Sequence, residues 1–218
     1  MDAKETIGNV IAQYDASFGV FDSVTLVGAE YRDANTTALS SYGLADPLDL
    51  SNPNIHGRPT DLAVYADDTG DYTTKSLFFQ QNLSFYDRAI LTFGARQDWM
   101  DLSATNFGVA SSDDFSESSF RAAFTYKVTD EVSAYASYVE SVAPPSIGVT
   151  PERGDQYEVG VKYEPAGYNA LITAAVFDLT RDDLTIAVVQ DDGTIVRQVV
   201  GEMRSRGLEI EGKAELYD

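Results

Sequence analysis

Apolar and polar residues alternate along much of this chain with a period of two. Between Tyr157 and Glu164 every second residue is apolar, and the residues between them are polar or glycine. The segment from Gly207 to Leu216 repeats the pattern, with charged side chains at Glu209, Glu211, Lys213 and Glu215. Successive side chains of a β-strand point to opposite faces. Each segment therefore predicts a strand with one apolar face and one charged face.

The same alternation persists over most of the sequence, and we expect about nine strands, long ones for a soluble sheet. Clear cases are Val10–Ala16, Ser76–Phe85, Arg88–Asp101 and Ser119–Val128, although Phe78 and Gln81 break the pattern in the second. Weaker cases, in which both faces hold small or apolar residues, are Val24–Arg32, Glu131–Ser141 and Ala170–Thr180. Such persistence is required of a barrel that has lipid outside and water inside.

The links between these segments alternate in length. Short links are expected at Ser17–Ser23, Tyr86–Asp87, Thr129–Asp130 and Pro165–Tyr168. Long links are expected at Asp33–Asp71, Leu102–Phe115, Val142–Gly154 and Asp182–Thr194. Outer-membrane barrels have tight periplasmic turns and long extracellular loops. The predicted fold is therefore all-β, an antiparallel up-and-down transmembrane β-barrel, of which these strands form a part.

Composition excludes several functional classes. The chain has 218 residues and a net charge of −20, which argues against binding to nucleic acid. There is no cysteine and one histidine, His56, which we expect in a loop. A single histidine excludes a multi-histidine metal site in residues 1–218, and a loop position argues against its use in a Ser-His-Asp triad. The glutamates of Gly207–Leu216 lie along one face of a strand. Acid–base catalysis by paired carboxylates would instead need a cleft that separates their pKa values. We expect no catalytic residue, metal site or cofactor, and hence no enzyme.

Several segments together resemble the barrel of TonB-dependent siderophore receptors, with the closest likeness to the ferrichrome-type branch. The segments are Tyr157–Tyr163, Ala170–Thr180, Gly201–Glu211, Leu91–Trp99 and Ala134–Ser141. The Arg-Ser-Arg-Gly sequence at Arg204–Gly207 is the most specific of these features. Residues carrying the likeness are Glu158, Gly160, Arg204, Arg206, Gly207 and Glu209.

The resemblance implies a receptor in the outer membrane of a Gram-negative bacterium, surrounded by outer-membrane lipid. It would bind a ferric siderophore and import it with energy supplied through TonB. Members are plugged barrels of about 22 strands, so residues 1–218 are expected to be a middle piece of one barrel domain, without the plug and the C-terminal strands. Selectivity would lie in loop and plug contacts, which are commonly aromatic and polar. Candidate ligand-binding residues are Tyr42, Tyr65, Trp99 and Tyr138.

Two features leave alternatives open. Gly160 and Gly207 lie on the predicted lumen row, where a glycine marks either close packing, as against a plug, or a bend without a partner. Arg204 and Arg206 lie at steps of two from Leu208, so they are expected on the same, lipid-facing side of the strand. Since arginine at mid-membrane costs about 2–4 kcal/mol, either they lie above the hydrocarbon band or a bulge at Gly207 resets the register.

Two other functions fit the same pattern less well. A passive porin shares the architecture and would differ in having an unplugged lumen. A soluble β-sandwich adhesin or carbohydrate-binding module is the alternative of another class, because one or two amphipathic strands also occur in soluble sheets.

Overall fold

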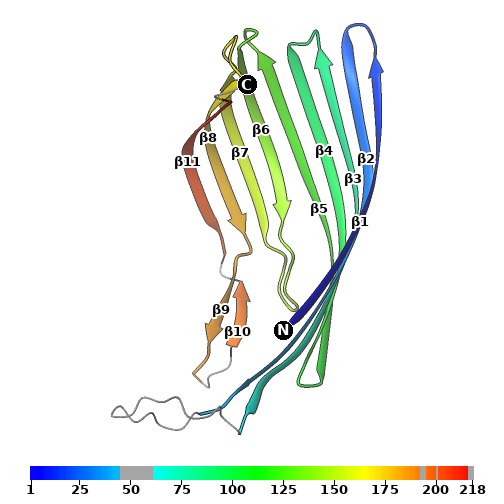
Figure 1. Cartoon of the computed structure of the whole chain (residues 1–218), viewed down its shortest axis with the longest axis vertical. Helices are drawn as coiled ribbons and strands as arrows, with labels where there is room; N and C mark the ends of the chain where they lie inside the picture. The colour runs from blue at the N-terminus through cyan, green and yellow to red at the C-terminus, as the bar shows by residue number, and fades with distance from the viewer. Residues whose placement is uncertain (45–60, 192–194, 200, 216–218) are drawn as a thin grey trace, which may run out of the picture.

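The computed structural model describes residues 1–44, 61–191, 195–199 and 201–215 (Figure 1). Within these ranges all regular structure is β-strand. The strands are β1 (Asp2–Ser17), β2 (Phe21–Tyr42), β3 (Ala63–Phe85), β4 (Ala89–Asn106), β5 (Val109–Lys127), β6 (Val132–Val142), β7 (Arg153–Tyr163), β8 (Ala170–Asp182), β9 (Thr185–Val189), β10 (Ile195–Val199) and β11 (Met203–Ala214). His56 lies outside the described residues. No helix found there is long and apolar enough to cross a membrane.

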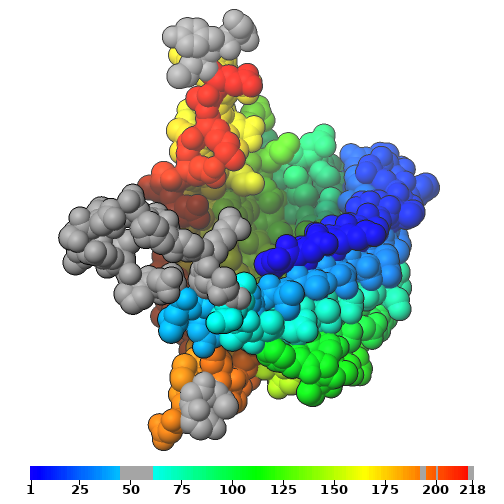
Figure 2. Space-filling model, turned by 60° about the horizontal axis from the view of Figure 1, so that its bottom comes forward, coloured from blue at the N-terminus to red at the C-terminus, as the bar shows by residue number. Residues whose placement is uncertain are grey.

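One large sheet dominates the molecule. Its nine strands lie in the order β1-β2-β3-β4-β5-β6-β7-β8-β11, and each pairs antiparallel with its neighbours. The sheet is curved, with β1 and β11 at its two edges and a hollow between them (Figures 1 and 2). The predicted all-β, up-and-down arrangement of about nine strands is confirmed. The sheet is a portion of a barrel wall and does not close on itself.

The two faces of the sheet differ as the alternation predicts. We call the set of side chains in line with Tyr157, Val159 and Val161 the outer row, and the set in line with Glu158 and Gly160 the inner row. The outer three are 61%, 58% and 45% exposed. Every strand residue of the large sheet that is buried belongs to the inner row: Gly28, Thr74, Ser76, Gly94, Met100, Gly154, Gly160 and Ala175. The inner row therefore lines the concave side.

The two residues that break the alternation in β3 have local partners. Gln81 lies on the outer row, where its side-chain Nε2 donates to Ser23 Oγ at 2.8 Å and its Oε1 accepts from Thr25 Oγ1 at 2.7 Å. Phe78 lies on the inner row, where its ring covers Gly28 on β2. Because an unpaired polar group costs several kcal/mol in hydrocarbon, the bonding of Gln81 makes its outer position tolerable.

Short and long connections gather at opposite ends of the sheet (Figure 1). The short-turn end holds the links after β1, β3, β5 and β7, as predicted. At the other end much of what the sequence predicts as loop is paired strand. β2 and β3 stay paired out to Tyr42 and Ala63. β4 and β5 are joined by a turn at Phe107 and Gly108, with φ of 46° and 79°, and β9 pairs with β10. We call these elements the long hairpins.

The prediction of long loops at these positions was wrong for a physical reason. Alternation is a signal of lipid on one face, and it fades where both faces meet water, although the backbone hydrogen bonds continue. The β-sandwich alternative is also wrong, since a sandwich needs two sheets packed face to face. In the part of the chain that the structure describes, the second sheet is only the β9–β10 hairpin.

Candidate functional site

On the inner row, four large side chains each lie over a glycine of an adjacent strand, which keeps the inner surface even. In each pair the two residues are directly opposite in the register. The pairs are Gly28 with Phe78, Gly94 with Arg121, Gly160 with Tyr135, and Gly207 with Phe177. Large side chains thus lie along the wall instead of projecting into the hollow. For Gly160 and Gly207 the close-packing alternative holds within the described residues, and the group that packs close is a ring of the neighbouring strand.

Around Gly160 the inner row carries a charged cluster. Tyr135 donates its hydroxyl to Glu158 Oε1 at 2.6 Å, and Gln156 Nε2 donates to Glu158 Oε2 at 3.0 Å. Lys162 Nζ lies 5.2 Å from the centroid of the Tyr135 ring. Glu209 lies on the same row two strands away, and no hydrogen bond to its carboxylate occurs among the described residues. The cluster presents carboxylates to the hollow and suits a cationic partner.

A second inner cluster is centred on Arg96. Its Nη2 donates to Glu30 Oε1 at 2.9 Å and to Ser76 Oγ at 2.8 Å, while its Nε donates to Asp98 Oδ1 at 2.9 Å. Ser76 is 2% exposed and donates to Asp98 at 2.5 Å. One guanidinium therefore ties β2, β3 and β4 together across the wall.

A cavity of about 340 Å³ on the concave side lies beside this cluster. It is lined by Arg96 and Arg121, with Gly94 and Phe78 between them. Arg121 donates to the side-chain oxygen of Gln80 and has no carboxylate partner within the described ranges. The cavity is of mixed character, because Glu30 and the two arginines line it together with apolar side chains.

Two of the four candidate ligand-binding residues come together at the long hairpins. The rings of Tyr42 and Tyr65 are 6.1 Å apart at an interplanar angle of 59°. Both are 60% exposed. They sit where β2 and β3 shift register beyond Ser40. This pair is an aromatic surface at the end of the sheet opposite the short turns.

The other two candidates lie elsewhere. Trp99 and Tyr138 belong to the outer row. The Tyr138 ring is 4.8 Å from that of Tyr157, and its hydroxyl lies 2.7 Å from Glu140 Oε1 and 3.0 Å from Asp155 Oδ1. The structure thus does not bring the four residues into one site, and their role in ligand binding stays a prediction.

Arg204 and Arg206 keep their outer position. Pairing of β11 with β8 runs from Met203 to Ala214 without a shift, so the bulge expected as one alternative is absent. Both arginines bond to Asp178, which the sequence analysis did not single out. Arg204 donates through Nε at 2.7 Å and Nη2 at 2.5 Å, and Arg206 donates through Nε at 2.9 Å.

Sequence reasoning missed Asp178, Tyr135 and Arg96. Asp178 carried a partial signal, because it follows the apolar Ile172, Ala174 and Val176 on its row of β8, but which cation pairs with it depends on the register. Tyr135 and Arg96 carried none, since their partners are set by the register between strands. The described residues contain no group of three or more His, Cys, Asp or Glu side chains placed to hold a metal ion.

Comparison with known proteins places these features in context. Residues 4–218 match the family model described as "TonB dependent receptor-like, beta-barrel". The chain is 29% identical over 208 residues to the ferrioxamine B receptor of Salmonella typhimurium (strain LT2), covering 92% of this chain and 29% of the relative. It is 31% identical over 210 residues to the ferrichrome outer membrane transporter/phage receptor of Escherichia coli (strain K12), covering 93% and 26%. The chain therefore spans less than a third of these relatives.

Among solved structures, the sheet matches the closed form of the ferric-catecholate import receptor Fiu from E. coli K12 with a TM-score of 0.80. The identity is 17%, and the match covers 99% of this chain and 36% of that chain. At this identity the likeness concerns the fold alone.

Proposed function

The chain belongs to the family of TonB-dependent receptor-like β-barrels, and from this premise we propose that it forms part of the wall of an outer-membrane receptor that imports ferric siderophores. The observation that carries the proposal is the curved nine-stranded sheet with an apolar outer row and a charged inner row. Only a closed barrel lets strands cross a bilayer with all backbone groups bonded. The names of the curated relatives, a ferrioxamine B receptor and a ferrichrome transporter, support a ferric siderophore as the ligand.

In the complete protein, the edges at β1 and β11 pair with further strands of the same barrel. The concave side is filled by a plug, which contacts the inner row where the large side chains lie over glycines. The cavity beside Arg96 and Arg121 and the carboxylates of Glu158 and Glu209 offer it polar contacts of both signs. Energy reaches the plug through TonB.

Ligand capture takes place at the long hairpins, which face the outside of a Gram-negative cell. Tyr42 and Tyr65 contribute an aromatic surface there, and Trp99 and Tyr138 are retained as further candidates. The family is made of receptors and transporters, and in this proposal the chain does no covalent chemistry. Outer-membrane lipid surrounds the outer row.

Uptake of radiolabelled iron tests the proposal. The complete gene is expressed in a Gram-negative host without its own siderophore receptors, and ferrichrome and ferrioxamine B are supplied as ferric complexes. We expect uptake of at least one, and its loss when TonB is deleted. Uptake that is independent of TonB, together with entry of unrelated small solutes, would instead indicate a passive porin.

The aromatic surface is tested in the same cells. Tyr42→Ala with Tyr65→Ala should raise the concentration for half-maximal uptake several-fold, because aromatic contacts dominate such surfaces. Tyr168→Ala is the matched control, since this tyrosine is 78% exposed but lies in a short turn at the opposite end. Equal effects of the two changes would exclude a role for the tyrosine pair in ligand binding.

A further inference from the structure

The β9–β10 hairpin leaves the large sheet at a junction where the strand ladder stops. Among the described residues, β9 pairs with β10 alone. Asp183 before β9 and Gly201 after β10 have φ of 57° and 107°, so the chain turns on both sides of the hairpin. Leu184 N donates to the carbonyl of Gly201 at 3.2 Å and closes the hairpin where it begins. A two-stranded hairpin is at best marginally stable in water, so its position depends on contacts from outside it.

Glu152, in the loop between β6 and β7, makes the main contact of this kind. Its Oε1 accepts a hydrogen bond from the backbone N–H of Thr185, the first residue of β9, at 3.1 Å. Its Oε2 accepts one from Nη2 of Arg181 on β8 at 2.6 Å. One carboxylate thus bonds to the wall and to the hairpin beyond the junction. In the same loop, Ser146 Oγ accepts from Nη1 of Arg197 on β10 at 2.7 Å.

The loop that carries Glu152, residues 143–152, is itself fixed to the wall. Pro151 is fully buried. Gly148 donates its N–H to Oδ2 of Asp113 on β5 at 3.0 Å. The position of the loop therefore does not depend on the hairpin, whereas the position of the hairpin depends on the loop.

The hairpin carries an apolar surface whose location is set by these contacts. Val189 on β9 and Ile195 on β10 are directly opposite in the register, and they are 68% and 69% exposed. The hairpin lies at the end of the sheet where ligand capture is proposed (Figure 1). Ligand sites are lined mainly by apolar side chains, so this pair suits the organic part of a metal chelate.

We propose that Glu152 is a positioning residue for ligand capture, which holds the β9–β10 hairpin in one place so that Val189 and Ile195 meet the ligand. Glu152 does not contact the ligand itself. A hairpin released from Glu152 presents its apolar pair for only a fraction of the time, and the apparent affinity falls by that fraction. The inference rests on the proposed function and deepens it.

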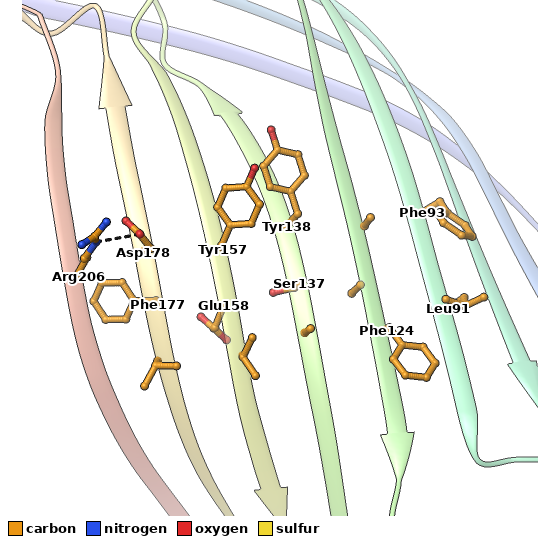
Figure 3. A pocket seen from close by; sticks show the side chains of 15 residues that line it. Leu91, Phe93, Phe124, Ser137, Tyr138, Tyr157, Glu158, Phe177, Asp178 and Arg206 are labelled. Atoms are coloured by element: carbon orange, nitrogen blue, oxygen red, sulfur yellow. Dashed lines mark hydrogen bonds and ion pairs between the residues drawn. The ribbon is translucent and has the colours of Figure 1, made fainter.

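The distance between two spin labels on the full-length receptor in detergent tests the position of the hairpin. One label is attached at Val189→Cys and the other at Tyr157→Cys, in a receptor without other cysteines. Tyr157 is paired on both sides of β7 and lies on the wall beside Tyr138 (Figure 3), so it serves as a fixed reference. Electron–electron double resonance should give one narrow distribution of distances.

Replacing Glu152 should change this distribution. Glu152→Ala removes both hydrogen bonds and should broaden it, while Glu152→Gln keeps an acceptor for the N–H of Thr185 and should broaden it less. Glu131→Ala is the matched control, because Glu131 also accepts from a backbone N–H, that of Ala166, but at the short-turn end. A narrow distribution in Glu152→Ala, or equal broadening in the control, would overturn the proposal.

Iron uptake separates positioning from a role in assembly. Glu152→Ala should raise the concentration for half-maximal uptake about fivefold, the factor that loss of one hydrogen bond gives, and should leave the maximal rate per receptor unchanged. An unchanged half-maximal concentration, or a fall in the maximal rate alone, would refute a role in ligand capture. The spin-label measurement needs neither iron nor TonB, so failure of the proposed function and failure of this inference are distinguishable.

Discussion

The side chain of Tyr135 on β6 lies over Gly160, the residue directly opposite on β7. A Cβ atom at Gly160 would lie 2.7 Å from two ring carbons and from the hydroxyl oxygen of Tyr135, which is closer than real Cβ atoms approach. The hydroxyl of Tyr135 is held at the same time by Glu158 at 2.6 Å. The position of the Tyr135 ring thus depends on the absence of a side chain at Gly160 and on the carboxylate of Glu158.

Gly160→Ala should therefore destabilise the folded receptor by about 1–3 kcal/mol, the usual effect of overpacking. Urea unfolding in lipid vesicles measures it. Gly212→Ala is the control, because nothing lies within 4 Å of a Cβ built there. Adding Tyr135→Ala to Gly160→Ala should recover part of the loss, as residues in contact are not additive. Strict additivity of the two changes would refute the packing argument.

Val161→Arg and Lys162→Ser test which face meets lipid. Val161 is on the outer row and 45% exposed, and arginine at mid-membrane costs about 2–4 kcal/mol. Val161→Arg should impair barrel assembly, seen as loss of the heat-modifiable band on gels. Lys162→Ser on the inner row should assemble normally. Equal mobility of the two variants would contradict the assignment of faces.

Asp178→Asn tests the ion cluster on the outer row. The change leaves Arg204 and Arg206 side by side without the carboxylate that both bond to, so the barrel should unfold at a lower temperature. Salt screens exposed charges over about 10 Å at 0.1 M, so the loss should shrink as salt is added. The melting midpoint of the heat-modifiable band at low and high salt measures both effects. A change that does not depend on salt would mean that repulsion between the arginines is not its cause.

The direction of the sheet in the membrane can be read with single cysteines, because this chain contains none. Leu44→Cys, at a position 90% exposed beyond β2, should react with an impermeant thiol reagent on intact cells. Ala166→Cys, in the short turn between β7 and β8, should react only after the outer membrane is breached. The reverse pattern would show that the long hairpins face the periplasm.

Much of the fold could be predicted because its cause is local. Tyr157, Val159 and Val161 are apolar since each one meets lipid, and any such residue is readable without knowing its neighbours. The partners of Gly160 and of Arg204 were not readable, because they depend on how far one strand is shifted against the next. The pairing of β2 and β3 beyond the bilayer was also missed, since water on both faces removes the alternation while leaving the backbone bonds.

Within the candidate site the same distinction holds. The tyrosines at 42 and 65 were selected for chemistry and position, and the hairpin brings them within 6.1 Å. Trp99 and Tyr138 were selected on the same grounds, yet parity places them on the outer row. The parity of Trp99 was readable, because it follows Leu91, Phe93 and Ala95 at steps of two in a strand without a register shift.

The length of β2 and β3 has a consequence for recognition. They have 22 and 23 residues, and about 10 of these suffice to cross the bilayer. About 12 residues of each remain, or roughly 40 Å of ladder at about 3.4 Å per residue. A loop of that length would lose conformational entropy each time it closed on a ligand. A ladder has lost that entropy on folding, so in the proposed receptor these two strands would meet a ligand as a stiff scaffold with its shape already set.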